Sequence, residues 1–210
     1  MTQPSNSINK LQVEENQAIW REYYQKAISR SHSKRTEFVH QLSKSNEGVA
    51  IDCGCGTGSD IDYLSAVGYK VYGFDPNPDA IEICVQRFAE RPQVSIQQAR
   101  FENFQYPQAN IVLANSSLFF ADPEQFNITW LRLTESILPG GVFAGDFLGS
   151  RDTWATNYRS PTTSFERASV EQLFEGFDII RFNERDEQAP TARGFLKHWH
   201  VFSVVAIKRS

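Results

Sequence analysis

The sequence contains little cysteine and methionine, and its few cysteines give no metal-binding pattern. Its 210 residues include three cysteines and one methionine. Cys53 and Cys55 form a Cys-x-Cys pair, which lacks the ligand spacing of a zinc finger and has no nearby Cys or His partner. We therefore expect no bound metal.

Long hydrophobic runs are also missing. No stretch approaches the roughly 20 consecutive apolar residues of a membrane span. The first ten residues, MTQPSNSINK, have neither the basic nor the apolar region of a signal peptide. These absences predict a soluble, cytoplasmic protein without a membrane partner.

Positive charge is in short supply as well. The formal net charge is −4, with a sequence pI near 5.6. Proteins that bind nucleic acid draw most of their non-specific affinity from Lys and Arg contacts to phosphates. The charge balance therefore disfavours a nucleic-acid partner and makes a small molecule the expected substrate.

The composition that remains is typical of a globular protein, with 40% hydrophobic and 22% charged residues. The length predicts a single domain over 1–210. We expect residues 1–14 to be flexible, residues 15–48 to form an N-terminal helical cap, and residues 49–210 to form the core. In the cap, one helix face is expected to carry Ile19, Trp20, Tyr23, Tyr24, Ala27 and Ile28.

After residue 48, short apolar runs alternate with amphipathic segments. Strands are predicted at 49–53, 69–74, 94–98, 110–115 and 142–147, and helices at 59–67, 78–90 and 123–137. Asn77-Pro78 and Asp122-Pro123 each supply an N-cap residue followed by a proline in the first helical position. Such alternation predicts a parallel sheet with helices on both faces.

The C-terminal part departs from this alternation. A helix is predicted at 169–175, with Ser169 as its N-cap, followed by an apolar run at 177–183 and the run KHWHVFSVVAIK. No helix fits between the two runs, so they should pair as an antiparallel hairpin. The predicted fold is α/β: a Rossmann-like, seven-stranded sheet, mostly parallel, with an antiparallel C-terminal strand and helices on both faces.

The stretch VAIDCGCGTGSDIDYL, residues 49–64, joins a buried strand to a helix through three glycines. Ligands of open α/β sheets bind at such loops, where glycines let the backbone come close and helix N–H groups attract anionic groups. Asp75 ends the second strand about twenty residues after the first glycine, where a carboxylate can accept both hydroxyls of a ribose. The simpler alternatives are a tight turn and a helix-capping aspartate.

Four motifs in succession resemble those of class I S-adenosylmethionine-dependent methyltransferases. They are IDCGCGTGSDIDYL, VYGFDPNPDAIEIC, NIVLANSSLFF and ILPGGVFAGDF, and their order and spacing match over about residues 49 to 147. The segments QARFENF and SSLFF are similar to those of small stand-alone enzymes related to tellurite-resistance methyltransferases. The resemblance implies an enzyme with S-adenosylmethionine as its cofactor.

The resemblance also implies roles for individual residues. It assigns nine to the cofactor: Asp52, Gly54, Cys55, Gly56, Asp75, Pro76, Phe101, Asn115 and Ser116. Asp75 would hold the ribose, and Asn115 would offer its carbonyl toward the cofactor's amino group. Arg100 occupies the position at which many relatives carry an aspartate that binds the adenine amino group. The backbone N–H of Phe101 is therefore expected to contact the adenine ring instead.

Catalytic candidates follow from the predicted topology. An antiparallel final strand brings His198 and His200 to the sheet edge that holds the glycine loop, where either could act as a general base. The segment after residue 147 could form a lid that turns Arg151 and Asp152 toward substrate. The alternatives are histidines that cap the core and an Arg151–Asp152 surface pair.

The predicted function is methyl transfer to a small-molecule nucleophile, through oxygen, nitrogen, sulfur or a metalloid. Two other functions stay open at this point. One is a cofactor-binding module without activity of its own. The other is an NAD(P)-dependent reductase, which the G-x-G-x-G spacing and the terminal hairpin oppose.

Overall fold

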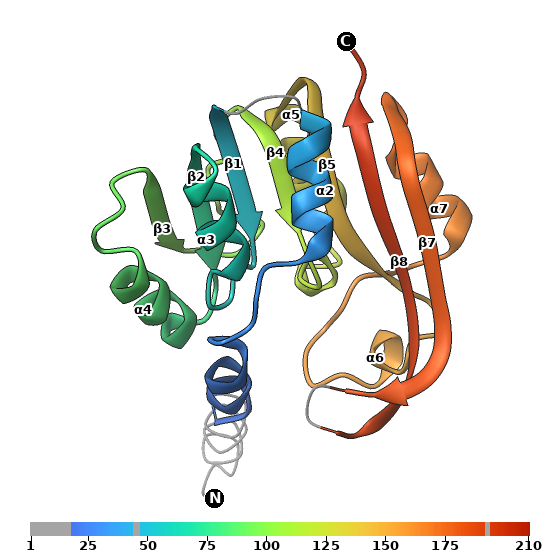
Figure 1. Ribbon diagram of the computed structural model, residues 1–210. Helices are drawn as coiled ribbons and strands as arrows, with labels where there is room; N and C mark the ends of the chain where they lie inside the picture. The colour runs from blue at the N-terminus through green and yellow to red at the C-terminus, as the bar shows by residue number, and fades with distance from the viewer. Residues whose placement is uncertain (1–17, 44–46, 192–193) are drawn as a thin grey trace, which may run out of the picture.

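A computed structural model describes residues 18–43, 47–191 and 194–210. The prediction for residues 1–14 and part of that for residues 15–48 lie outside the described residues. The described strands form one eight-stranded sheet in the order β3-β2-β1-β4-β5-β8-β7, with β6 paired to β5 off this path (Figure 1). The strands are β1 (Gly48–Cys53), β2 (Tyr69–Asp75), β3 (Val94–Gln98), β4 (Ala109–Ala114), β5 (Ile137–Gly149), β6 (Ser164–Phe165), β7 (Phe177–Pro190) and β8 (Leu196–Lys208).

The sheet is parallel except around its last strand. β1, β2, β3, β4 and β5 pair in parallel, whereas β8 runs antiparallel to both of its neighbours, β5 and β7. The predicted α/β fold and the predicted terminal hairpin are therefore confirmed, and β8 lies inside the sheet as expected. The short β6 is an eighth strand that the sequence pattern did not predict.

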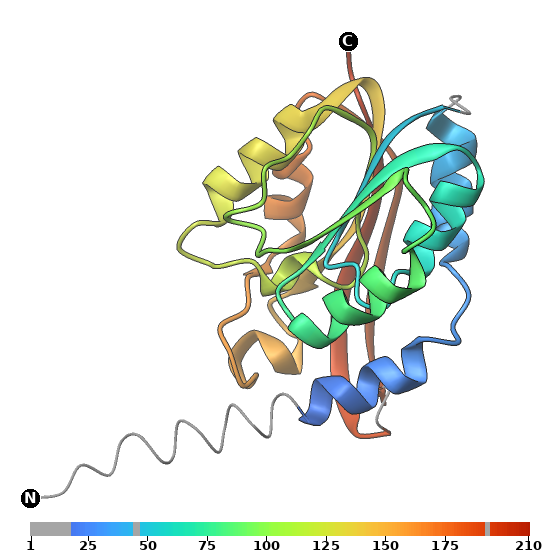
Figure 2. The ribbon, with the colours of Figure 1, turned by 90° about the vertical axis from the view of Figure 1, so that its left-hand side faces the viewer.

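Helices cover both faces of the sheet (Figure 2). They are α2 (Lys34–Ser43), α3 (Ser59–Ala66), α4 (Pro78–Arg87), η1 (Leu118–Phe120), α5 (Phe126–Ser136), α6 (Thr153–Thr156) and α7 (Arg167–Leu173). Residues 18–27 are also helical and lie beyond the carboxyl ends of β1 and β4 (Figure 1). None of the helices in the described ranges is long and apolar enough to cross a membrane.

Two apolar clusters fill the space between the layers. The cluster beneath α5 and α7 is strongly aromatic, and Trp130 of α5 stands edge-on to Phe143 and Phe147 of β5 at 5.1 and 5.5 Å between ring centres. The cluster on the other face packs α2, α3 and α4 through aliphatic side chains such as Val39 and Leu64. Because both faces of the sheet are buried, the central strands carry apolar side chains on both sides and appear in the sequence as continuous apolar runs.

Two helices begin elsewhere than predicted. α5 begins at Phe126 and not at residue 123, because the Asp122 carboxylate accepts the Glu124 N–H at 2.9 Å and thereby caps a separate turn. α7 begins at Arg167, with Glu166 in the N-cap position, so Ser169 lies inside the helix and does not cap it. A side chain that can cap a helix can equally cap a turn, which the local sequence does not distinguish.

β5 and the hairpin are longer than the predicted runs. β5 starts directly after α5, and its pairing with β4 shifts between Ala109↔Ile137 and Ile111↔Val142, so the intervening glycine pair forms an irregularity. At the other end, the β5–β8 pairing stops at Leu148↔Val201, whereas β7 and β8 stay paired as far as Pro190↔Leu196. The hairpin therefore continues as a two-stranded arm past the end of β5 (Figure 1).

Candidate functional site

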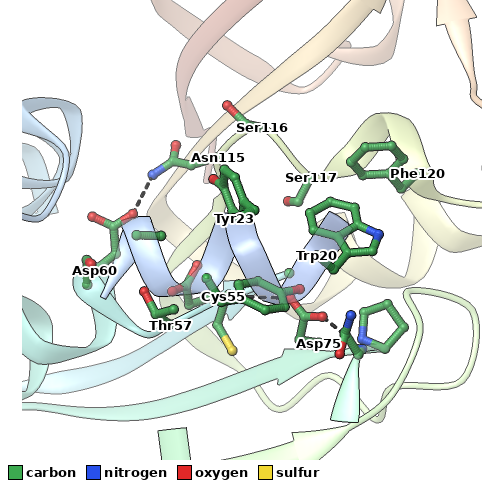
Figure 3. A pocket seen from close by; sticks show the side chains of 18 of the residues that line it. Trp20, Tyr23, Cys55, Thr57, Asp60, Asp75, Asn115, Ser116, Ser117 and Phe120 are labelled. Atoms are coloured by element: carbon green, nitrogen blue, oxygen red, sulfur yellow. Dashed lines mark hydrogen bonds between the residues drawn. The ribbon is translucent and has the colours of Figure 1, made fainter. Parts of the chain in front are cut away.

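A cavity of about 520 Å³ lies at the carboxyl ends of the parallel strands. Its floor is formed by the residues that follow β1, β2, β3 and β4, and the helix at residues 18–27 covers it. Residues 158–160, which follow α6, close one side. In Figure 3 side chains from these separate parts of the chain face one another across the cavity.

The glycine loop after β1 presents backbone to the cavity. Gly54 and Gly56 have φ angles of +72° and +52°, in the left-handed region that glycine occupies without strain. A Cβ on Gly54 would lie 2.5 Å from the Cβ of Ser117, whereas a Cβ on Gly56 would meet only the Tyr24 ring, at 3.9 Å. The wall at Gly56 is therefore bare backbone that a ligand can approach closely.

Asp75 stands at the end of β2 with both carboxylate oxygens engaged. Oδ2 accepts the Gly56 N–H at 3.0 Å, and Oδ1 accepts the Asn77 N–H at 2.9 Å. Burial raises the pKa of Asp75, and these two N–H bonds offset only part of the rise. Each oxygen keeps a second lone-pair direction, so the carboxylate can still accept hydroxyl groups from a ligand.

Asp52, at the end of β1, is a second buried carboxyl group that lines the cavity. Burial raises its pKa well above the usual range, and the negative charge of Asp60 adds to the rise. A cationic ligand group beside it would favour the charged carboxylate. This part of the cavity is thus suited to a positively charged group.

Asn115 follows β4 and has its amide orientation fixed by Asp60 of α3. Its Nδ2 donates to Asp60 Oδ2 at 2.9 Å (Figure 3), while Oδ1 is buried and has no hydrogen-bond partner among the described residues. Asp60 Oδ1 in turn accepts the Ser33 N–H at 2.9 Å and the Thr36 hydroxyl at 2.7 Å. Asn115 therefore offers an unpaired acceptor at the cavity wall.

The segment after β4 is held in place by Asp146 of β5. Both terminal nitrogens of Arg35 donate to this carboxylate, at 2.7 and 2.6 Å, and the Ser116 N–H donates at 2.8 Å. Burial alone would raise the pKa of Asp146, but the hydrogen bonds and charge of Arg35 outweigh it and hold the pKa below its usual value. This network was missed from the sequence, where the only signal was a lone aspartate in the apolar run GGVFAGDF.

All of the residues predicted to hold the cofactor line this one cavity. They are Asp52, Gly54, Cys55, Gly56, Asp75, Pro76, Phe101, Asn115 and Ser116. Arg100 lines it as well, so the departure from the family pattern lies at the site itself. The fold thus brings together residues from four different strand ends.

The predicted catalytic residues lie elsewhere, on and beside the hairpin arm. None of Arg151, Asp152, His198 and His200 lines the cavity. Arg151 Nε donates to Asp186 Oδ2 at 3.0 Å, and His198 Nε2 lies 2.7 Å from Asp186 Oδ1. The strand pairing brings His198 and His200 of β8 into contact with β7, and the approach of all four side chains to substrate stays a prediction.

His200 is fully buried, and both of its ring nitrogens are engaged. Nδ1 accepts the Arg151 backbone N–H at 3.1 Å, so the ring proton resides on Nε2 and is donated to Glu184 Oε1 at 3.0 Å. The backbone N–H of His200 donates to Asp152 Oδ2 at 2.9 Å, and Asp152 also pairs with Lys197. A histidine whose lone pair already binds the backbone is not free to take a proton from substrate.

The same arm holds a cluster with ligand-type atoms. One such atom each from Glu184, Asp186 and His200 lie within 4.8 Å of one another. The Arg151 guanidinium, however, donates to Glu184 at 3.1 Å as well as to Asp186. Because this side chain already supplies the positive charge, we assign the group as an ion-pair cluster and not as a metal site.

Comparison with known proteins agrees with this geometry. Residues 50–141 match the family model for the methyltransferase domain. No curated protein matches the chain. Among solved structures, TehB from Haemophilus influenzae is 18% identical with a TM-score of 0.68; the match covers 82% of this chain and 62% of TehB.

A second similar structure is 1,6-didemethyltoxoflavin-N1-methyltransferase from Burkholderia thailandensis, with 1,6-didemethyltoxoflavin and S-adenosylhomocysteine bound. It is 16% identical, with a TM-score of 0.67, and the match covers 100% of this chain and 92% of that one. At these identities the solved structures show the fold.

The residues present also fit the cofactor of this family. The bare wall at Gly56, the unpaired acceptor of Asn115 and the carboxyl groups of Asp52 and Asp75 suit a molecule that carries hydroxyl groups and positive charges. The matched family model spans the strand ends that supply all four of these residues. Residues 50–141 therefore carry a methyltransferase domain, and the strand ends of this domain supply residues that fit S-adenosylmethionine as the cofactor.

Proposed function

We propose that this methyltransferase acts on a small-molecule nucleophile that it encloses in the 520 Å³ cavity. The observation that carries the proposal is that the same cavity is also lined by the aromatic side chains of Trp20, Phe120 and Tyr158, which we call the chamber. Cavities of about 300–1,000 Å³ are typical of small-ligand sites. The similar methyltransferase with 1,6-didemethyltoxoflavin bound supports a small substrate, and the cytoplasmic location stays a prediction from the sequence.

We further propose that the nine predicted residues hold the cofactor. Asp75 would bind the ribose hydroxyls, and the Asn115 carbonyl and Asp52 would face the amino group. Pro76 would lie against the adenine, and the Phe101 N–H, which has no partner among the described residues, would reach a ring nitrogen. Bound S-adenosylmethionine supplies an electrophilic methyl group on a sulfonium centre.

The chain's own contribution is then to position the nucleophile and to exclude water. No histidine occurs among the described residues that line the cavity, and the carboxylates of Asp60 and Asp75 already accept hydrogen bonds. Alignment of two reactants can by itself supply a large part of the rate enhancement. We therefore favour catalysis by alignment over general-base catalysis from His198 or His200, whose catalytic role stays a prediction.

The domain organisation is proposed on the same grounds. The helix at residues 18–27 covers a cavity whose floor belongs to the sheet, so the N-terminal cap and the core would form one methyltransferase domain. Neither part encloses the substrate chamber alone.

A pair of aspartate variants tests the cofactor site. Asp75→Asn should weaken S-adenosylmethionine binding by roughly 10-fold or more, because a charged acceptor of ligand hydroxyls is worth about 1.5–3 kcal/mol. Asp178→Asn, at an exposed position paired with Arg209 far from the cavity, is the matched control and should bind normally. Calorimetric titration measures both, and equal affinities in the two variants would contradict the assignment.

The substrate side needs a separate assay. Turnover should be screened with thiols, amines, phenols and metalloid oxyanions, using wild type and Phe120→Ala. We expect product from at least one class, and a loss of turnover in the variant with cofactor affinity retained, because Phe120 lies on the side of the cavity away from Asp60 and Asn115 (Figure 3). Methylation of a protein or nucleic acid but of no small molecule would contradict the proposal.

A further inference from the structure

The chamber wall is aromatic and comes from segments far apart in the chain. Trp20 of the N-terminal helix stands edge-on to Phe120 of η1 at 6.0 Å between ring centres, and Phe120 lies 5.4 Å from Tyr158. Trp20 also stacks on Tyr24 at 5.7 Å, with the planes 22° apart. In Figure 3 Trp20 and Phe120 lie together on the side of the cavity away from Asp60 and Asn115.

Three arginines that line the cavity form no ion pair within the described part of the chain. Arg30, Arg100 and Arg159 all line the cavity, and none of them forms an ion pair with a carboxylate among the described residues. The cavity's carboxyl groups are those of Asp52, Asp60 and Asp75, and Asp60 lies on the side away from Trp20 and Phe120 (Figure 3). The three arginines therefore remain available to an anionic group of a ligand.

Arg159 is the arginine best placed to bind a substrate. Its guanidinium carbon lies 5.4 Å from the Trp20 ring centre and 4.7 Å from that of Tyr158, so two rings flank the group. Stacking engages the faces of a guanidinium and leaves its N–H edges free to form a bidentate pair with a carboxylate. Arg30, by contrast, has one N–H directed at the Tyr23 hydroxyl, at 3.4 Å, and Arg100 is next to the proposed adenine contact at Phe101.

We propose that the substrate is a small aromatic acid, whose ring lies among Trp20, Phe120 and Tyr158 and whose anionic group is bound by Arg159. This inference rests on the proposed function, since it describes the substrate of the same cavity. Aromatic rings favour offset or edge-on contacts with other rings, which aliphatic substrates do not provide. The fork of Arg159 selects for a planar anion over a neutral group of the same shape.

Three probes separate the effect of charge from that of the ring. Benzoate, benzamide and cyclohexanecarboxylate are titrated into the complex of the protein with S-adenosylhomocysteine, which cannot donate a methyl group. We expect benzoate to bind about tenfold more tightly than benzamide, the ratio for one charged hydrogen-bonded contact. It should also bind more tightly than cyclohexanecarboxylate, which has the charge but no aromatic ring.

Variants then assign the charge preference to one residue. Arg159→Gln should abolish the preference for benzoate over benzamide. Lys26→Gln is the control. It removes one positive charge from the exposed face of the helix that carries Trp20, where Lys26 pairs with Glu22, and it should keep the preference for benzoate. The inference would be overturned if Arg159→Gln kept the preference or if wild type bound benzoate and benzamide equally. It would also be overturned if no probe bound at about 10 mM, a concentration at which weak fragments bind.

Failure of this inference is distinguishable from failure of the proposed function. S-adenosylmethionine is titrated into every preparation first, without a probe. If the cofactor binds and the aromatic anion is not preferred, only the substrate class is wrong. If the cofactor does not bind to wild type, the proposed function itself is contradicted.

Discussion

Gly56 and Gly140 share a left-handed backbone but differ in what surrounds them. Their φ angles are +52° and +75°. A Cβ at Gly140 would find nothing within 4 Å, whereas a Cβ at Gly56 would stand in the cavity facing Tyr24. A comparison of substitutions at the two positions therefore distinguishes the effect of backbone strain from the effect of blocking the ligand.

Alanine at either position should cost a similar amount of stability, about 1–2 kcal/mol for a left-handed non-glycine residue. Only Gly56→Ala should also weaken S-adenosylmethionine binding, by roughly tenfold or more, the loss of about 1.4 kcal/mol. Thermal unfolding and calorimetric titration of both variants measure the two effects. Normal cofactor affinity in Gly56→Ala would show that the ligand does not approach this part of the loop.

Asp52 gives a prediction that depends on pH. Burial raises its pKa in the folded protein above the unfolded value, so the stability it contributes is present below the unfolded pKa and is lost as the pH rises through the folded pKa. Asp52→Asn cannot ionise, so it should match wild type near pH 4 and become more stable than wild type toward pH 8, by about 2–4 °C per kcal/mol. A difference in melting temperature that is constant with pH would contradict this.

The site residues that could be predicted from the sequence are those with a local signature. Gly56 and Asp75 stand at fixed spacing from the first strand, so motif and spacing located them. Trp20 and Tyr158 gave no such signal, because what matters is their contact with Phe120, across gaps of 100 and 38 residues in the chain. Contacts of this kind depend on how segments pack, which single-sequence periodicity does not report.

Among the elements, the arm formed by β7 and β8 differs most from expectation. The predicted antiparallel pairing is present but longer than expected, and His198, His200 and Arg151 form ion pairs with acidic side chains of β7. The His200 ring fills the space beside Gly149, where a Cβ would lie 2.0 Å from Nδ1. This packing gives the ring a structural role that the alternating pattern of KHWH could not disclose.

We expect His200→Ala to lower stability by roughly 2–4 kcal/mol, since it empties a buried site and leaves polar partners unpaired. Cofactor affinity and turnover per folded molecule should change by less than about threefold, and the pH profile of turnover should keep its shape. His198→Ala, at a position whose side chain is 35% exposed, is the control and should have little effect on either stability or turnover. A loss of roughly 10²-fold in turnover with normal cofactor binding, in either variant, would support a catalytic role for the histidine that was replaced.

The residue at which a helix begins could not always be predicted from the local sequence. Asn77 caps α4 as predicted, its side chain accepting the Asp79 N–H at 2.9 Å, whereas Asp122 uses the equivalent bond to Glu124 for a turn ahead of α5. Both are Asx-Pro sequences, so the local chemistry is the same. At Asp122 the bond caps a separate turn, and α5 begins four residues later at Phe126, a member of the aromatic cluster.

At the scale of the whole molecule, the N-terminal helix, the sheet and the segment after α6 meet in one cavity. If they form one domain, unfolding should show a single transition, and bound cofactor should stabilise all of it. At about 100 times its dissociation constant, S-adenosylmethionine should add about 2.7 kcal/mol, or roughly 5–10 °C in a chain of this length. Differential scanning calorimetry would reveal a second transition, insensitive to cofactor, if part of the chain folded separately.

The aromatic chamber has a consequence for how such a protein diversifies. Trp20 and Tyr158 stand outside the sheet, whereas Gly56, Asp75 and Asn115 stand at strand ends. Substitutions in the outer segments can change the shape and charge of the chamber while the strand ends stay as they are. Selection for a new methyl acceptor can therefore act on two short stretches of chain, and the ancestral use of the methyl donor is inherited intact.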